Sequence, residues 1–126
     1  QKLVVEEVHR AGKPFLLHSC GQLELVMEDL IEYVGIDAKH SFEEAVTPVV
    51  EAKKRWGNRI GIAGGIDVDF LSRATVSEIK QASKRAMDIC SEGGGFLFGS
   101  GNTVTNYVPV ENYLAMIEAA REFNGT

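Results

Sequence analysis

Residues 59–67 read RIGIAGGID, a short apolar run that ends in two glycines and an aspartate. Continuous apolar character, without alternation of polar residues, is typical of a β-strand that is covered on both faces. The glycines that follow permit a tight turn, or a close approach of the backbone to a ligand. The stretch therefore predicts a strand over 59–63 whose carboxyl end opens into a loop able to carry functional groups.

The same arrangement recurs along the chain. Further short apolar strands are predicted at 14–17, 36–39 and 96–98. A polar loop follows each of them, reading HSCG at 18–21, KHSFE at 39–43 and GSGN at 99–102. Apolar residues at helical spacing predict helices between the strands, over 2–9, 22–33, 41–56, 75–92 and from 109, with a short turn at 69–73. Ser41 with Glu44, and Thr75 with Glu78, have the spacing of capping boxes.

Strands that alternate with helices indicate parallel strands joined by right-handed crossovers. Four such units fit either a small doubly wound sheet or half of a TIM (β/α)8 barrel. The polar loop after every strand favours the barrel, because in a barrel all these loops meet at the catalytic face. A complete barrel needs about 250 residues. We therefore expect an α/β fold with four parallel β-α units, forming half of a barrel from a longer chain.

Composition limits the classes of function. The 126 residues suit a single domain, 1–126, with 44% hydrophobic and 25% charged residues. A net charge of −5 argues against a nucleic-acid partner. No apolar run reaches the ~20 residues of a membrane span, and no signal peptide is visible at the start. The two cysteines, Cys20 and Cys90, give no disulfide framework, which favours a cytoplasmic location.

His18 and Cys20 are the first candidates for chemistry. An imidazole and a thiolate are both good zinc ligands, and residues two apart in an extended segment point to the same side. The alternative is a buried thiol beside a hydrogen-bonded histidine at the end of a strand. A zinc site needs at least one more protein ligand, and the candidates by position are His40, Glu43, Asp67 and Ser100.

Asp67 and His40 are predicted as catalytic residues because each follows the carboxyl end of a strand. For Asp67 the alternative is a helix cap for the turn that begins at Val68, and we weigh capping above catalysis. Lys39, beside His40, is predicted to bind an anionic group of the substrate. Gly65, Ser100 and Asn102 complete the predicted substrate-binding residues, because glycine lets backbone approach a ligand and polar side chains can hydrogen-bond it.

Four stretches together resemble the C-terminal half of the uroporphyrinogen decarboxylase superfamily. They are HSCG (18–21), GIDAKHSFEEA (35–45), RIGIAGGID (59–67) and GGGFLFGSGNTVTNYVPVENYLAMIEAAREF (93–123), and the run from Val108 to Ala119 is the most specific part. The superfamily includes the decarboxylase of haem biosynthesis and zinc- and cobalamin-linked methyltransferases. The resemblance implies that the chain is the C-terminal half of a (βα)8 barrel.

The resemblance implies two different sites for the two branches. In the methyltransferases, His-x-Cys after a strand and a later Cys in the final glycine loop hold a zinc that activates a thiol. His18 and Cys20 match the first part, but Ser100 stands where the second cysteine is expected. In the decarboxylase the same loop resembles Gly-His-Gly, and that histidine is also absent. HSCG therefore favours the methyltransferase-like side.

Three functional hypotheses follow. The first is a zinc-dependent methyltransferase that acts on a small-molecule thiol, with the corrinoid cofactor carried by a partner protein. The second is uroporphyrinogen decarboxylase, a tetrapyrrole carboxy-lyase that needs no cofactor. The third is an inactive fragment that self-associates into a homo-oligomer, because a half-barrel leaves strand edges and one face of its sheet uncovered.

Overall fold

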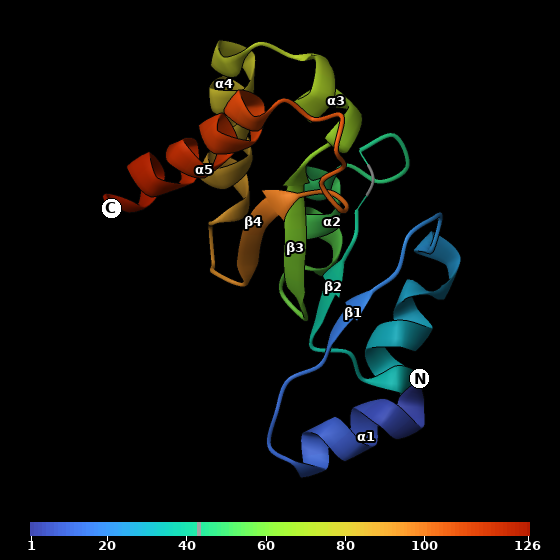
Figure 1. The fold of residues 1–126 in the computed structure, drawn as a ribbon. Coiled ribbons are helices and arrows are strands. Elements are labelled where there is room, and N and C mark those ends of the chain that lie inside the picture. The colour runs from blue at the N-terminus through green and yellow to red at the C-terminus, as the bar shows by residue number, and fades with distance from the viewer. Residues whose placement is uncertain (43) are drawn as a thin grey trace.

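The computed structural model describes residues 1–42 and 44–126, in which four parallel strands form one sheet in the order β1-β2-β3-β4. The strands are β1 (Leu16–His18), β2 (Ala38–His40), β3 (Gly61–Ile66) and β4 (Phe96–Ser100). Figure 1 shows them side by side, with helical segments between successive strands. The predicted α/β fold with four parallel β-α units is confirmed, although β3 and β4 continue further toward their carboxyl ends than the sequence predicts.

The helices occupy most of the predicted ranges. They are α1 (Lys2–Arg10), α2 (Val49–Trp56), α3 (Val68–Arg73), α4 (Val76–Cys90) and α5 (Val110–Asn124). The capping box that opens α4 is present as predicted, because the Thr75 side chain accepts from the Glu78 backbone and the Glu78 side chain accepts from the Thr75 backbone. Two shorter helical segments, η1 (Glu24–Val26) and η2 (Asp29–Val34), follow β1.

The regular α-helix predicted over 22–33 is wrong in its geometry. η1 is a 3₁₀-helix and η2 is a π-helix. In η2 the Gly35 N–H donates to the Leu30 carbonyl at 3.0 Å, across five residues. Gly35 then ends the segment with a φ of 82°, which glycine adopts without strain. Only Met27 and Leu30 become buried, while Leu25 is almost fully exposed, so the apolar periodicity overstated how much of this segment faces the core.

The helix predicted to start at Ser41 is also wrong. α2 begins at Val49, immediately after Pro48. Proline lacks an N–H and disfavours helical geometry in the residue before it, so a helix starts after it. Glu44 does not complete a capping box with Ser41. Its Oε1 instead accepts from the Val49 N–H at 2.8 Å, which satisfies one free donor at the start of α2.

One face of the sheet is covered and the other is not. Leu17 pairs with Lys39, and Lys39 with Ile62, so these three side chains lie on one face. All three are buried, and α2 and α4 both contact β3. On the other face, Leu16 and Leu97 remain 50% and 54% exposed. Helices therefore cover one side of this four-stranded sheet, as on the outside of a barrel.

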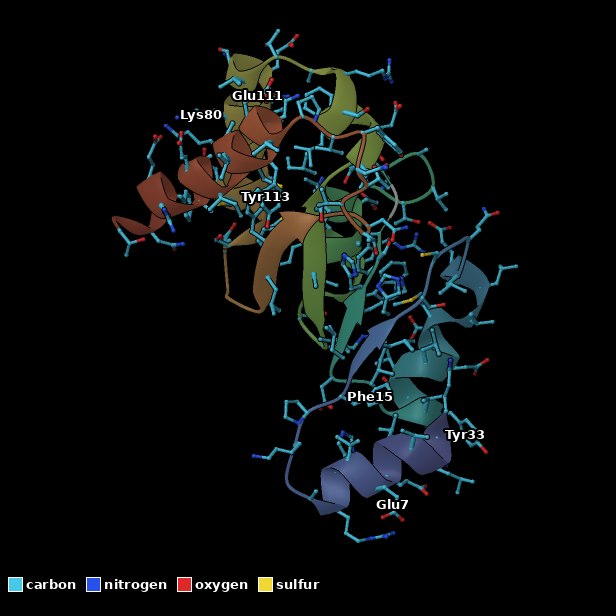
Figure 2. The ribbon with its side chains drawn as sticks, viewed as in Figure 1. Glu7, Phe15, Tyr33, Lys80, Glu111 and Tyr113 are labelled. Carbon is cyan, nitrogen blue, oxygen red and sulfur yellow. The ribbon has the colours of Figure 1, made fainter. Side chains whose placement is uncertain are left out.

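A second apolar cluster joins α3, α4 and α5 beyond the end of β3. Its buried members are Ile66, Leu71, Ile79, Val108, Ala115 and Met116. Within it, the buried amide of Asn112 donates to the carbonyls of Leu71 and Ala74, both at 2.9 Å. Lys80, labelled in Figure 2 with Tyr113 of α5, forms ion pairs from α4 with Glu118 and Glu122 of α5.

Asp37 links α1 to the segment before β1, in addition to the packing of α1 against η2. The Asp37 carboxylate accepts from the Phe15 N–H at 2.6 Å and lies 2.7 Å from His9 Nε2. Burial alone would raise the pKa of Asp37, but the Phe15 and His9 contacts outweigh it and hold the pKa below its ordinary value. The Lys2 ammonium also lies over the Tyr33 ring. Figure 2 shows Phe15 between α1 and β1 and Tyr33 beside the start of α1.

Across residues 1–42 and 44–126, no helix is both long enough and apolar enough to cross a membrane.

Candidate functional site

The carboxyl ends of β1, β2 and β4 bring five predicted site residues together. His18 is the pairing partner of His40 at the end of the first two strands, so both rings lie on the same face. Ser100 ends β4, and Cys20 and Asn102 stand two residues beyond β1 and β4. His18 and Cys20 are exposed, whereas the other three are half-buried. The cluster lies on the sheet face opposite to the helices.

The two histidines form a hydrogen-bonded pair. Their Nδ1 atoms lie 2.7 Å apart, and the ring centroids are separated by 4.8 Å. The other ring nitrogen of His40, Nε2, lies 3.0 Å from the Ser100 carbonyl oxygen. A carbonyl oxygen only accepts hydrogen bonds, so His40 Nε2 donates in this contact. Both nitrogens of His40 are therefore engaged by protein groups.

Cys20 is held between the first and the last of these loops. Its Sγ lies 3.6 Å from His18 Nε2, and the Asn102 Nδ2 donates to Sγ at 3.3 Å. Asn102 Oδ1 accepts from the Thr103 N–H at 2.8 Å. That backbone contact fixes the orientation of the amide, because only the oxygen can accept, and so it turns the amide nitrogen toward the sulfur.

The separation of His18 Nε2 and Cys20 Sγ fits two ligands of one zinc ion. Zinc bonds of about 2.1 Å to nitrogen and 2.3 Å to sulfur, at a tetrahedral angle, place the two donors about 3.6 Å apart. The observed 3.6 Å is close to that value. Within residues 1–42 and 44–126, however, no group of three or more His, Cys, Asp or Glu side chains is placed to hold a metal. The pair can therefore supply two ligands, not a complete zinc site.

The side chains predicted as third ligands lie elsewhere or are used otherwise. The Ser100 hydroxyl donates to the Asn102 carbonyl at 2.8 Å and so shapes the turn after β4. Asp67 Oδ1 accepts from the Phe70 N–H at 2.9 Å, which is the helix cap that the sequence predicts ahead of a catalytic role. Glu43 lies outside the described residues.

Lys39 is not directed into the cluster. It is 2% exposed, and its Nζ donates to the carbonyls of Ser41 at 2.6 Å and Ser19 at 3.3 Å. Its ammonium also lies 4.2 Å from the centre of the Phe42 ring. Adjacent residues of a strand face opposite sides, so Lys39 points toward the helices while His40 points into the site. These contacts correct the predicted placement at the mouth: Lys39 links the loops after β1 and β2.

Gly65 lies in β3, against the neighbouring strand β4. It is buried with a φ of 149°, and a Cβ built on it would lie 2.9 Å from the Phe98 ring. The space that a side chain would need is therefore filled by a phenylalanine of the neighbouring strand. The absence of a side chain serves the packing of β3 against β4, and Gly65 also borders an open cavity on the helix side of the sheet. Its predicted contact with a substrate stays a prediction.

The sequence does not reveal the contribution of Thr103 or the position of Glu44. Thr103 acts through its backbone N–H, which no residue pattern reveals. Glu44 borders an open cavity of about 830 Å³ on the helix side of the sheet, together with Asp67, Arg73 and Arg85. Burial raises the pKa of Glu44 above its ordinary value, the Val49 N–H opposes that rise, and the nearby Asp67 charge adds to it. The one sequence feature that indicates that Glu44 caps α2 is its position shortly before Pro48, after which a helix can begin.

Comparison with known proteins gives one family. The sequence profile described as uroporphyrinogen decarboxylase (URO-D) matches residues 1–123. A uroporphyrinogen decarboxylase of Coxiella burnetii (strain Dugway 5J108-111) is 28% identical over 114 residues, covering 87% of this chain and 28% of the relative. A uroporphyrinogen decarboxylase of Trichodesmium erythraeum (strain IMS101) is 27% identical over 136 aligned positions, covering 98% of this chain and 34% of the relative.

Among solved structures, a methyltransferase from Methanosarcina mazei superposes with a TM-score of 0.70 at 24% identity. The alignment covers 98% of this chain and 35% of that protein. The likeness confirms a fold like half of a TIM barrel. This chain spans about a third or less of the length of the relatives that it matches.

Proposed function

Because the chain belongs to the uroporphyrinogen decarboxylase family, we propose that it forms part of a zinc-dependent methyltransferase acting on a thiol. The observation that carries the proposal is the pair of His18 Nε2 and Cys20 Sγ, 3.6 Å apart at the open end of the sheet. Both side chains are exposed, so a metal and a small substrate can reach them. The matching methyltransferase fold supports this branch of the family.

In this proposal His18 and Cys20 hold the metal at the mouth of the barrel. Zinc, when bound, lowers the pKa of a substrate thiol and makes it a nucleophile at neutral pH. The methyl group comes from a corrinoid carried by a partner protein. The transfer would join that methyl group to the thiol sulfur, with the electron pair of the broken bond left on the corrinoid and the thiol proton passed to solvent. His40 and Asp67 as catalytic groups, and Ser100 and Asn102 as substrate contacts, stay predictions.

The remaining ligands must come from outside the described residues. The pair supplies two of the four positions of a tetrahedral zinc site, and the substrate thiol takes one more. The curated relatives are about three times as long as this chain, so further residues of a longer protein are the source that we propose for the fourth.

Metal stoichiometry and model methyl transfer test the proposal together. The full protein, which includes the residues proposed to supply the fourth ligand, should bind about one zinc per site formed by His18 and Cys20. Cys20→Ser should remove it, since a hydroxyl is a poor zinc ligand. The matched control is Cys90→Ser, because Cys90 lies at the end of α4 and is fully buried in the apolar core. With methylcobalamin as donor and a simple alkyl thiol as acceptor, methyl transfer should depend on Cys20. Equal, near-zero zinc in wild type and Cys20→Ser would refute the proposal.

A second candidate is a decarboxylase acting on a carboxylated tetrapyrrole. It is favoured by the two curated relatives, both of them uroporphyrinogen decarboxylases. Such a site needs cations to hold the acid side chains of the substrate, and Lys39 is buried on the opposite face. Incubation of the full protein with uroporphyrinogen, followed by chromatography of the products, decides between the two activities. Loss of carboxyl groups without any zinc requirement would favour the decarboxylase.

A third candidate applies to residues 1–126 by themselves, as an inactive homo-oligomer. β1 and β4 are the edge strands of the sheet, and Leu16 and Leu97 expose apolar surface on its uncovered face. Edges and apolar patches of this kind favour association. Analytical ultracentrifugation should find a dimer or a larger assembly, and a stable compact monomer would contradict self-association. The two free cysteines agree with the cytoplasm, which stays a prediction.

A further inference from the structure

The hydrogen bonds around His40 determine which nitrogen of His18 is free. The Ser100 carbonyl requires a proton on His40 Nε2. A neutral His40 then has an unprotonated Nδ1, which accepts from His18 Nδ1 across 2.7 Å. A neutral His18 that carries its proton on Nδ1 presents an unprotonated Nε2, and this is the atom that faces Cys20 Sγ. The chain of contacts thus selects the tautomer in which Nε2 is available to a metal.

Cys20 is oriented by a similar chain on its other side. The Asn102 amide donates to Sγ and is itself held by the backbone N–H of Thr103. Hydrogen bonds to a thiolate ligand stabilise its charge and alter its strength as a donor. The chain at the end of β4 therefore acts on both members of the pair. The Ser100 carbonyl acts on His18 through His40, and Asn102 contacts Cys20 directly.

From this geometry we infer that the loop 100–103 provides no ligand but orients both ligands, with His40 as the positioning residue for His18. The inference rests on the proposed function, because it gives the pair the role of metal ligands. Neither Ser100 nor His40 can bind the metal without breaking an existing contact. The Ser100 hydroxyl holds the turn after β4, and both nitrogens of His40 already form hydrogen bonds. Outer-shell partners of this kind typically contribute 10–100-fold to metal affinity.

The tautomer can be measured without any metal. Long-range proton–nitrogen NMR of the metal-free protein at neutral pH should show His18 protonated on Nδ1 and His40 protonated on Nε2. In His40→Phe, which keeps an aromatic ring but offers no acceptor, His18 should lose this preference. In His40→Asn, whose Oδ1 can accept from His18 Nδ1, the preference should return. A wild-type His18 protonated on Nε2, or one whose tautomer does not change in His40→Phe, would overturn the inference.

Metal affinity gives the second readout. Zinc binding by competition with a chromophoric chelator should weaken about 10–100-fold in His40→Phe and recover for the most part in His40→Asn. His9→Phe is the matched control, since His9 is also paired through its ring but lies on α1 beside Asp37. It should bind zinc as the wild type does. Unchanged affinity in His40→Phe would overturn the role of His40 in orienting the ligand.

Asn102 is tested by the spectrum of the cobalt-substituted protein. Removing the N–H donor in Asn102→Ala should raise the energy of the sulfur electrons and shift the thiolate-to-cobalt charge-transfer band to longer wavelength. Asn106→Ala, an exposed change in the same loop, is the control and should leave the band in place. An unshifted band in Asn102→Ala would overturn the contact with sulfur. If the wild type binds no metal, the proposed function fails, and the NMR measurement still decides the assignment of His40.

Discussion

Polar residues stand at the carboxyl ends of β1, β2 and β3, but those of β1 and β2 have a different role from that of β3. After β1 and β2 the chain runs through loops, at 19–23 and at 41–42 and 44–48, before the next helical segment begins. After β3 only Asp67 separates Ile66 from the start of α3. At the first two strands His18 and His40 point into a shared cluster, whereas at the third the carboxylate of Asp67 caps the helix that follows.

The difference teaches that loop length decides what a polar residue at a strand end can do. A helix that starts one residue after a strand leaves four backbone N–H groups in need of partners, and the nearest carboxylate takes one of them. A longer loop satisfies its own backbone groups, as Ser19 does by donating to His40 and accepting from Ser41. The side chains in such a loop then remain available for a ligand.

Metal binding is the strongest test of the difference between the ends of β1 and β2 and the end of β3. Cys20→Ser should lower zinc affinity by more than the ~10–100-fold that an outer-shell partner contributes, whereas Asp67→Asn should leave it unchanged, because Asp67 contacts α3 and not the cluster. Isothermal titration with zinc measures both variants. An Asp67→Asn protein that lost zinc would place Asp67 in the site and would remove the contrast between the two regions.

A substitution at Gly65 tests whether the end of β3 serves packing and stability. Gly65→Ala should lower the free energy of unfolding by about 2–4 kcal/mol, from backbone strain at positive φ and overlap with the Phe98 ring. Gly99→Ala is the control, since the neighbouring strand position has no atom within 4 Å of an added Cβ. Urea denaturation measures both. A fully stable Gly65→Ala would show that this glycine is not required for packing.

Asp67 itself separates capping from catalysis. Asp67→Ala should cost about 1 kcal/mol of stability, whereas Asp67→Asn should cost little, because asparagine caps helices as well as aspartate does. Thermal unfolding gives the stability, and the methyl-transfer assay gives the activity. If Asp67→Asn kept its stability but lost activity, Asp67 would be a catalytic residue, as first predicted from its position.

The smallest effect concerns Glu44, across the cavity from Asp67. Its raised pKa means that the folded protein binds the proton more tightly than the unfolded chain, so stability falls as pH rises from about the ordinary value of 4.5 through the folded pKa. Glu44→Gln keeps an oxygen that accepts from Val49 and removes this loss. We expect its melting temperature at pH 7 to rise by about 1–2 °C, with no difference from wild type at pH 3.

Glu51→Gln serves as the control for Glu44→Gln. Glu51 is an exposed carboxylate in the first turn of α2, where negative charge is favourable. Its removal should lower stability slightly at pH 7. Scanning calorimetry at both pH values compares the two variants, and a Glu44→Gln protein that is less stable than wild type at pH 7 would refute the role assigned to burial.

Sequence alone predicted the parallel strands and most of the cluster. Strand ends were visible as apolar runs that stop at polar residues, and parallel strands bring those ends to one edge, so His18, Cys20, His40, Ser100 and Asn102 were all predicted site residues. Alternation along β2 would also have placed Lys39 and His40 on opposite faces, a signal that the prediction did not use.

Other features were beyond the reach of residue patterns. The π-helix η2 is defined by backbone hydrogen bonds across five residues, which a periodic apolar face does not specify. The role of Gly65 depends on Phe98, more than 30 positions away, and this partner becomes apparent only when β3 and β4 pair. The orientation of His18 by a backbone carbonyl leaves no trace in the sequence, since every residue has one.

That carbonyl has a consequence for how this protein can change over evolutionary time. The hydrogen bond from His40 is accepted by the main chain of Ser100, so mutation at position 100 can alter the side chain without deleting the acceptor. Likewise, the group that holds the Asn102 amide is the main-chain N–H of Thr103, which every amino acid except proline retains. Position 103 can therefore vary widely while the alignment of Cys20 survives, whereas position 100 keeps the acceptor for His40 in every variant but keeps the turn only with a hydroxyl.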